Sequence, residues 1–276
     1  QKSSIPCLEG VLLRAGVALQ LTGYNLETGI TVHVGAQIQE AGSCVMPARL
    51  FFDIVRKLPD EMVSITVDHK QQVSIRAGAA FFQITAMDSE DYPELPDVNG
   101  KSGVTMPQSA LKAMISGTIF SVSENQARPI QTGCLMEVTE DSVTMVAVDS
   151  FRLARRTWHT QNAANHTLKF VVPAAGLKEI ERILEDSDEP VTFTLGDKHI
   201  LFSIGDALLV SRVLEGEFID WRRVVPTNCG TVLTANVAEL TSSIERVSLI
   251  ISEKVKSPVR CVFGDNMADF RTANTI

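Results

Sequence analysis

The residues that could carry catalysis are few in this chain, and their spacing does not suit catalytic chemistry. Asp149-Ser150 offers a carboxylate beside a hydroxyl, but the five histidines are scattered and complete no Ser-His-Asp pattern. The acidic run 185–189 (EDSDE) lacks the glycine and the spaced terminal glutamate of a calcium loop. Phosphate-binding, dinucleotide-binding, hydrolase and zinc-protease motifs are absent from the sequence. We therefore expect no enzyme active site, no metal and no cofactor.

The five cysteines give no sign of a zinc site or a disulfide framework. They are odd in number, far apart, and contain no Cys-x-x-Cys pair. Free, mostly buried thiols in a reducing cytoplasm are the expected state. The sequence shows no apolar run near the roughly 18 residues of a membrane helix, and its start, Gln1-Lys-Ser-Ser, resembles no signal peptide. We expect a cytoplasmic protein without a membrane partner.

The net charge of −8 argues against a protein that simply coats nucleic acid. An acidic body can still carry one local basic face. A nucleic-acid contact, if present, is therefore expected on one restricted surface.

A long internal repeat is the most informative pattern. The segment 45–58 (VMPARLFFDIVRKL) is echoed by 171–184 (VVPAAGLKEIERIL), and residues 111–129 are echoed by 240–258. The two offsets, 126 and 129 residues, are too long for a solenoid unit and have the length of a domain. The chain is therefore expected to contain one domain copied in tandem.

The elements that follow from periodicity are short strands and short helices. Alternating apolar residues predict strands at 63–67, 73–75, 82–84, 191–195 and 200–204. Apolar stripes predict helices at 48–57 and 174–184, each preceded by proline, and a second helix family near 108–117 and 237–246. We divide the chain into copies 1–103 (opening helix missing), 104–227 (complete) and 228–276 (N-terminal part only).

Several stretches resemble a known family in its order and spacing. They are 47–59 (PARLFFDIVRKLP), 91–95 (DYPEL), 148–154 (VDSFRLA) and 215–226 (EGEFIDWRRVVP), of which 149–154 is the most specific. The chain resembles the bacterial DNA polymerase III beta subunit, the beta sliding clamp family. The resemblance implies an α+β fold of tandem DNA-clamp domains, with short helices packed on antiparallel sheets. Three domains form a crescent, here with the third copy incomplete, and two crescents close head to tail around duplex DNA.

The resemblance also implies a peptide pocket at the junction of the second and third domains. The residues carried over to it are Gln131, Val148, Ser150, Phe151, Arg152, Leu153, Ile219, Arg223 and Val224. Apolar anchors with arginine at the rim are the usual composition of such sites. From the residues alone, Leu153 and Val224 fit an ordinary core and Arg152 a surface ion pair. Four positions depart from the family: Gln131 replaces an apolar residue, Ser150 a common glycine, Phe151 a common histidine and Ile219 a common proline.

Two further surfaces are implied by the resemblance. Lys2, Arg56, Lys112, Asn125, Arg128 and Lys178 would face DNA, although a solvated helix face explains any one of them equally well. Leu50, Phe82 and Ile84 would form one side of a dimer seam, and Leu249 and Ile250 the other. The run Leu249-Ile-Ile251 is compatible with an interface or with a buried strand.

The leading hypothesis is a non-enzymatic sliding clamp, a component of the DNA polymerase III holoenzyme. It would encircle double-stranded DNA without reading sequence and tether the polymerase catalytic subunit for processive synthesis. Its pocket would also dock the clamp loader and repair proteins that carry a clamp-binding motif, and the full-length protein would be a homodimer. The alternative is a tandem β-rich scaffold that binds only proteins; a ring-forming seam and inward basic residues separate the two. A hydrolase would need an acid–base site that the sequence does not offer.

Overall fold

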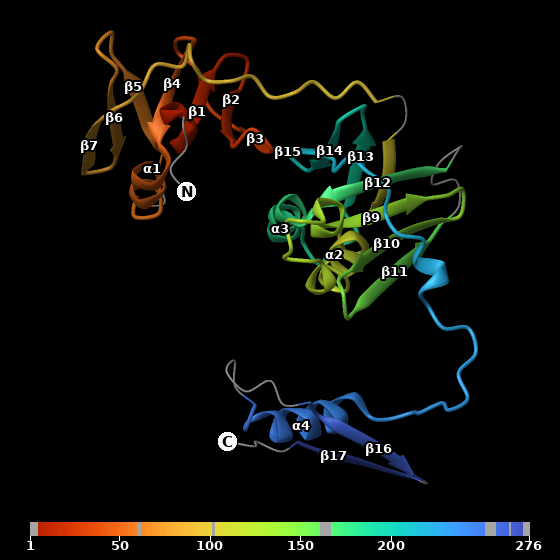
Figure 1. The fold of residues 1–276 in the computed structure, drawn as a ribbon. Coiled ribbons are helices and arrows are strands. Elements are labelled where there is room, and N and C mark those ends of the chain that lie inside the picture. Colours follow the sequence, from red (N-terminus) through yellow and green to blue (C-terminus); the bar gives the residue numbers. More distant parts are fainter. Residues whose placement is uncertain are drawn as a thin grey trace. The chain divides into compact units, whose positions relative to one another are not determined.

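The computed structural model describes residues 5–59, 62–100, 103–160, 167–251, 258–264 and 266–272. It forms two compact units, Gln1–Ile219 and Asp220–Ile276 (Figure 1). Short helices on antiparallel sheets make up the first unit, so the predicted α+β class is confirmed. The three-copy division stays a prediction.

The first unit contains two successive sets of elements. The first set is η1 (Pro6–Glu9), β1 (Gly10–Ala15), β2 (Leu19–Tyr24), β3 (Thr28–Val34), β4 (Gly42–Pro47), α1 (Ala48–Val55), β5 (Ser64–Val67), β6 (Gln72–Ala77) and β7 (Ala80–Thr85). The second set opens with β8 (Gly103–Pro107), α2 (Gln108–Ser116) and η2 (Ile119–Ser121). It continues with η3 (Pro129–Thr132), β9 (Gly133–Val138), β10 (Ser142–Val148), β11 (Leu153–His159), β12 (Leu168–Pro173), α3 (Ala174–Ile183), β13 (Pro190–Leu195), β14 (His199–Ile204) and β15 (Ala207–Arg212).

The two sets share one strand register, so residues in one have counterparts in the other. Gly10 pairs with Pro47 as Gly133 pairs with Pro173. A Cβ atom at Gly10 would overlap Val45, and one at Gly133 would overlap the Val172 carbonyl, so both crossings need glycine. In the hairpins, β6–β7 turns at Gly78 and β14–β15 at Gly205, both at φ +53. The two Val-x-Pro-Ala helices, α1 and α3, therefore occupy equivalent positions, as the sequence repeat predicts.

The helices form because their apolar residues recur at helical spacing behind a proline. Phe51 and Ile54 are the buried residues of α1, and Leu177 and Ile180 are their buried counterparts in α3. Proline before the first helical residue is compatible with the helix start. The expected helices thus exist, with α1 ending at Val55.

An eight-stranded sheet joins the two sets, in the order β4-β1-β2-β3-β15-β14-β13-β8. The join is the antiparallel pair β3–β15, in which Ile30 lies opposite Leu209 and Thr28 opposite Ser211. The remaining strands form a four-stranded sheet, β11-β10-β9-β12, and a three-stranded sheet, β5-β6-β7. The described strands that end these three sheets are β4, β8, β11, β12, β5 and β7, so β7 and β11 each have one edge without a strand partner.

The larger core belongs to the second set. There α2 lies beside α3 (Figure 1) and adds Leu111, Met114 and Ile115 to the buried cluster. The core of the first set is smaller, and no described element there corresponds to β8 and α2. The α1 helix consequently leaves Phe52 61% exposed.

The second unit contains η4 (Trp221–Arg223), α4 (Val237–Ser248), β16 (Arg260–Gly264) and β17 (Met267–Arg271). The Asn236 side chain caps α4 by accepting from the backbone N–H groups of Ala238 and Glu239. No residue of α4 is buried, so local capping and contacts with β17 hold this helix. None of the helices in the described ranges is long and apolar enough to cross a membrane.

Candidate functional site

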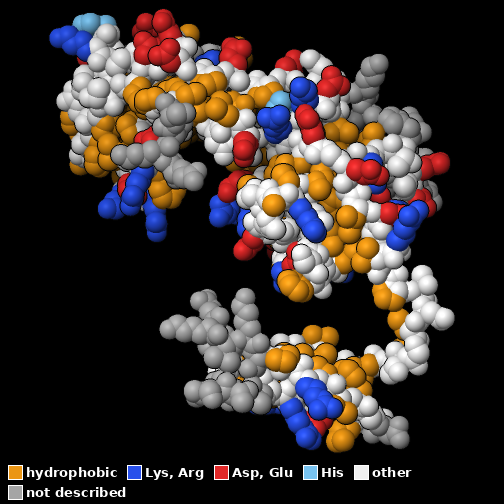
Figure 2. Space-filling view, in the orientation of Figure 1, with side chains coloured by type: hydrophobic (Ala, Val, Ile, Leu, Met, Phe, Trp, Pro, Cys, Tyr) orange, Lys and Arg blue, Asp and Glu red, His pale blue; other side chains and the backbone are white. Residues whose placement is uncertain are grey.

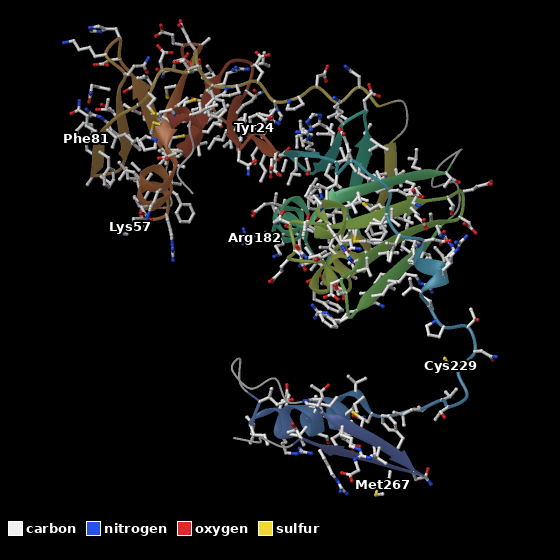
Figure 3. All side chains as sticks on the ribbon, viewed as in Figure 1. Tyr24, Lys57, Phe81, Arg182, Cys229 and Met267 are labelled. Atoms are coloured by element: carbon white, nitrogen blue, oxygen red, sulfur yellow. The ribbon has the colours of Figure 1, made fainter. Side chains whose placement is uncertain are left out.

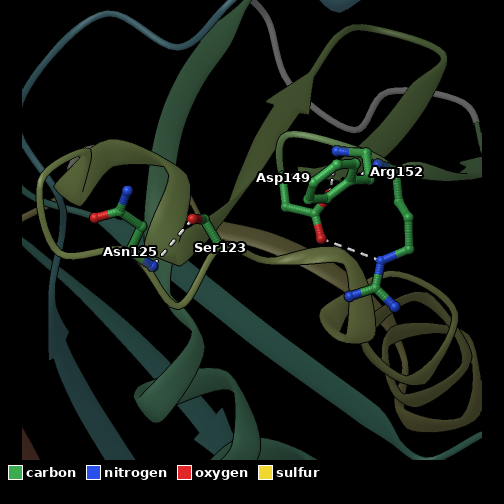
Figure 4. A network of polar contacts seen from close by, with 5 residues as sticks. Ser123, Asn125, Asp149 and Arg152 are labelled. Atoms are coloured by element: carbon green, nitrogen blue, oxygen red, sulfur yellow. Dashed lines mark hydrogen bonds and ion pairs between the residues drawn. The ribbon is translucent and has the colours of Figure 1, made fainter. Parts of the chain in front are cut away.

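The turn between β10 and β11 is held by one carboxylate. Asp149 Oδ1 accepts from the backbone N–H groups of Phe151 and Arg152, at 2.7 Å each, and Oδ2 accepts from Arg152 Nε at 3.1 Å (Figure 4). The bond from the Phe151 N–H, followed by those from Arg152, lowers the pKa of Asp149. The turn leaves the Phe151 side chain 96% exposed at its tip.

The first set of elements contains the same turn, which separates fold from function. There Asn25 Oδ1 accepts from the backbone N–H of Glu27 at 3.0 Å and of Thr28 at 2.7 Å. The counterpart of Phe151 is thus the charged residue Glu27. The turn itself belongs to the fold, whereas an aromatic tip is particular to the second set.

Beside this turn lies a partly apolar surface built from three predicted pocket residues. Val148 ends β10 with 4% exposure, and Leu153, its partner at the start of β11, is half-buried. The β9–β10 register pairs Leu135 with Val146, so the chain before β9 runs toward the end of β10. Gln131 lies in that stretch, is 9% exposed, and its carbonyl accepts from Ser123 N–H at 2.8 Å.

The remaining predicted pocket residues lie in the turn, at the end of the first unit and in the second unit. Ser150 is exposed in the turn, and Ile219 is half-buried at the end of the first unit. Arg223 and Val224 belong to the second unit, where Arg223 Nε pairs with Asp220 Oδ2 at 3.1 Å and Val224 is 54% exposed. Their membership of a common pocket stays a prediction.

The predicted DNA-facing residues are exposed to different degrees. Arg56 caps the end of α1, Lys178 is exposed on α3, and Asn125 and Arg128 lie in an exposed loop. Lys112 on α2 instead pairs with Asp186 at 3.2 Å, which offsets its charge. Lys2 lies outside the described residues.

Basic side chains gather at α1 (Figure 2), where Arg49 and Lys57 accompany Arg56. Lys57, and Arg182 on α3, point away from the sheets that their helices cover (Figure 3). Arg182 is bonded to Glu179 at 2.7 Å, so α3 presents a more balanced charge than α1. Arg49 and Lys57 were not among the residues predicted to face DNA, although their positions off the apolar stripe are the signal for exposure.

The predicted seam residues of the first set lie at the free edge of β7. The counterparts of Phe82 and Ile84 are Leu209 and Ser211, both 0% exposed where β3 pairs with β15. Phe82 and Ile84 are half-buried because nothing described pairs with β7 on that side.

Leu50 on α1 is 45% exposed at the position that Gly176 occupies on α3. A Cβ atom at Gly176 would lie 2.7 Å from Ser211 Oγ and 3.7 Å from Thr28 Oγ1, so this position borders the β3–β15 join. Leu50 thus occupies the position beside β7 that corresponds to that join.

The other predicted half of the seam lies at the end of α4. Leu249 is 83% exposed and Ile250 47% exposed, so the alternative of a buried strand is wrong. Phe81 was missed by the sequence reasoning; it is 51% exposed on the outward side of β7, with the Arg76 guanidinium 4.7 Å from its ring centre. In the described part of the chain, no three His, Cys, Asp or Glu side chains are placed to hold a metal ion.

Sequence profiles of the DNA polymerase III beta subunit match both parts of the first unit. The N-terminal domain profile covers residues 1–96 and the central domain profile residues 105–220. The beta sliding clamp of Bacillus subtilis is 30% identical over 261 residues, covering 91% of this chain and 69% of that protein. The beta sliding clamp of Staphylococcus epidermidis is 28% identical, covering 99% and 74%.

Solved structures agree with the sequence matches. The crystal structure of the Bacillus subtilis DNA polymerase sliding clamp superposes with a TM-score of 0.88 at 28% identity, covering 99% of this chain and 78% of that chain. The beta subunit of DNA polymerase III from Thermotoga maritima gives a TM-score of 0.89 at 26% identity, covering 98% and 73%. The chain belongs to the beta sliding clamp family of DNA polymerase III beta subunits.

Proposed function

We propose that this protein is a non-enzymatic sliding clamp that acts in the cytoplasm. It encircles double-stranded DNA and tethers the catalytic subunit of DNA polymerase III for processive synthesis. The link to DNA is topological, so the protein needs no contact that reads bases. Its partners besides DNA are the polymerase, the clamp loader and other proteins that carry a clamp-binding motif.

The join between β3 and β15 is the observation that carries this proposal. It connects an edge of the first set of elements to an edge of the second, head to tail. The free edge of β7 corresponds to that of β15, and the free edge of β11 to that of β3. The free edges of β7 and β11 can therefore each pair with a strand of another copy in the way that β3 pairs with β15. Head-to-tail contacts of this type generate a closed ring when the rotation per copy closes.

The helices supply the surface that such a ring turns toward DNA. The α1 and α3 helices occupy equivalent positions, so a repeated head-to-tail join carries them to the same side of the sheets. The basic residues of α1, with Lys178 on α3, offer charge that attracts phosphate without sequence preference. The net charge of −8 repels DNA from the remaining surface.

Retention on closed DNA tests the ring. Full-length protein loaded on a circular duplex should stay bound through a salt wash and leave when the circle is cut. A protein that binds phosphates directly would dissociate steeply with salt, whether or not the DNA has ends. If salt alone strips the protein from uncut circles, the clamp is excluded and the protein-binding scaffold takes its place. Arg56→Glu combined with Arg128→Glu should reduce loading and leave the melting temperature unchanged, because both side chains are exposed.

We further propose that the surface beside the β10–β11 turn receives the clamp-binding motif. Leu153 and Val148 offer an apolar floor, and the Asp149 bonds hold the turn next to it. A peptide of the Gln-Leu-x-Leu-Phe type would bury its leucines there. Leu153→Ala should weaken its binding by about 1–3 kcal/mol, the range for an interface anchor. Arg223→Ala should weaken binding by a similar amount with less effect on stability. Equal affinity of wild type and both variants in a calorimetric titration would remove the site.

A further inference from the structure

We propose that an open pocket on the second set of elements docks a partner protein, which contributes a short linear segment with one apolar side chain flanked by lysine or arginine. The pocket lies between β12, the turn from β13 to β14 and the segment that follows β15, and it has a volume of about 470 Å³. Ligand pockets span roughly 300–1,000 Å³. The pocket is separate from the peptide surface beside the β10–β11 turn, because β12 and β11 are opposite edges of the four-stranded sheet.

The first set of elements shows that the fold does not require an opening at this place. There Val45 on β4 forms an isolated bridge with Met87. Two residues away from the bridge on each chain, the hydroxyls of Ser43 and Ser89 are hydrogen-bonded at 2.8 Å. This bond ties the segment after β7 to β4.

The second set keeps the bridge and loses the serine pair. Val171 on β12 bridges Leu214, but the positions two residues away hold Lys169 and Gly216. Gly216 has no side chain to bond across the gap, and it adopts φ +129, where other residues are strained. The hydrogen bond that ties the two segments in the first set therefore has no equivalent at these two positions.

The segment after the bridge is also longer in the second set. Six residues, 215–220, lie between the bridge and the buried Trp221, whereas four, 88–91, lie between the first bridge and the buried counterpart Tyr92. The longer segment includes Phe218, which is buried and lines the pocket. The opening is thus particular to the second set.

The floor of the pocket is apolar. Leu135 on β9 and Val171 on β12 are register partners, and both are buried. Phe170 beside them is also buried, where the first set has the smaller Cys44. The half-buried apolar side chains of the lining are Leu195, Val213 and Leu214. An apolar side chain that enters the pocket displaces water from this surface, which favours binding.

The exposed rim of the pocket is acidic. Asp197 comes from the turn after β13, and Glu215 and Glu217 come from the segment after β15. Among the described residues that line the pocket, Lys169 is the single cation, so three carboxylates face one ammonium and the balance is −2. Lysine or arginine on both sides of an apolar anchor complements this rim, whereas aspartate or glutamate would be repelled. Because the pocket is open, the flanking charges stay in water and avoid the cost of desolvation.

A designed probe tests the proposal. The probe is a fluorescein-labelled Gly-Lys-Lys-Leu-Lys-Lys-Gly peptide, compared with one that has asparagine in place of leucine and one that has glutamate in place of each lysine. In fluorescence anisotropy titrations of the wild type, the leucine probe should bind about tenfold more tightly than the asparagine probe, the effect of burying much of one leucine side chain. The glutamate probe should bind at least tenfold more weakly than the leucine probe.

Matched charge variants separate the rim from general attraction to an acidic protein. Glu215→Gln combined with Glu217→Gln should weaken the leucine probe by about threefold to tenfold, the effect of two exposed ion pairs. Glu40→Gln combined with Glu140→Gln removes the same charge from exposed loop positions and should change the affinity by less than twofold. All four positions are exposed, so each double variant should keep the wild-type melting temperature.

Amide chemical shifts locate the bound probe. The N–H signals of Gly196 and Gly216 should move on binding, and that of Phe151 should stay. The proposal is overturned if the asparagine probe binds as tightly as the leucine probe, or if the two double variants weaken binding equally. It is also overturned if the probe moves Phe151 instead of Gly216, which would place it beside the β10–β11 turn. A pocket that binds no probe but whose Glu215 and Glu217 variants change self-association would serve a second copy of this chain, and the proposal would again be wrong.

Discussion

The pair Leu209 and Phe82 offers the most direct test of the head-to-tail join. The two residues are counterparts on β15 and β7, but their surroundings differ. Leu209 is 0% exposed, because β3 pairs with β15 beside it, whereas Phe82 is half-buried at a free edge. Truncating each to alanine therefore separates the stability of the folded chain from the strength of self-association.

Leu209→Ala removes a fully buried side chain from the core of the second set. A loss of this kind costs about 2–5 kcal/mol. In a unit of this size each kcal/mol lowers the melting temperature by about 2–4 °C, so a loss near 3 kcal/mol gives a shift of roughly 6–12 °C. Phe82→Ala removes a half-buried side chain, and we expect about 1–2 kcal/mol. In dilute protein, Leu209→Ala should therefore be the more destabilising change.

For self-association, Phe82→Ala should have the larger effect and Leu209→Ala the smaller one. Pairing of β7 with another chain would bury the rest of the Phe82 side chain, worth about 1–2 kcal/mol, or roughly tenfold in affinity. Urea unfolding at low concentration measures the first effect, and sedimentation velocity across a concentration series measures the second. Phe82→Ala should shift the dissociation constant, and Leu209→Ala should leave it unchanged. If both variants lose the same stability, or if Phe82→Ala associates like wild type, the β7 edge is not the seam.

Three further predictions concern pH, thiols and chain cleavage. The pKa of Asp149 is lowered in the folded chain, so the hydrogen bonds of its turn stabilise the fold above about pH 4, and this stability is lost as pH falls through the folded-state pKa. The amide chemical shift of Phe151 in an NMR pH titration should report this loss. Burial raises the pKa of Cys134 to about 12, so its protonated thiol stabilises the fold below about pH 9 and this contribution is lost from there to pH 12. In native protein a thiol reagent should modify the exposed Cys229 and Cys261 and spare Cys134. Limited proteolysis should cut first within 226–236, where every residue is exposed.

The helices and the strands β5, β6, β7, β13 and β14 could be predicted because their signals are local. The proline before each Val-x-Pro-Ala helix and the buried residues at helical spacing fixed the existence of α1 and α3. The ends were less certain: α1 stops at Val55, while α4 extends to Ser248, beyond the expected end at 246. Helix ends depend on capping and on contacts with the following loop, which periodicity does not encode.

Contacts between distant segments could not be predicted from any local pattern. The β3–β15 pair joins strands that are separated by most of the first unit, and neither strand was among those that alternation predicted. The ion pair between Lys112 and Asp186 is of the same kind; it reduces the charge of a residue that sequence alone places among the candidates for DNA contact. The Asp149 turn was identified as the most specific motif, but its bonds explain only its shape.

The internal repeat provides the control that separates folding from function at each candidate position. Where counterparts agree, as Gly10 and Gly133 do at a close backbone crossing, the shared residue reflects the fold. Other counterparts differ in residue type and also in burial or strand pairing. The shared fold does not explain such a difference in residue type, because the same fold accepts both residues. Phe82 is such a position, since its counterpart Leu209 is 0% exposed beside β3 whereas Phe82 is half-buried at a free edge. The half-buried Phe82 at the free edge of β7 therefore stays a candidate for the predicted seam.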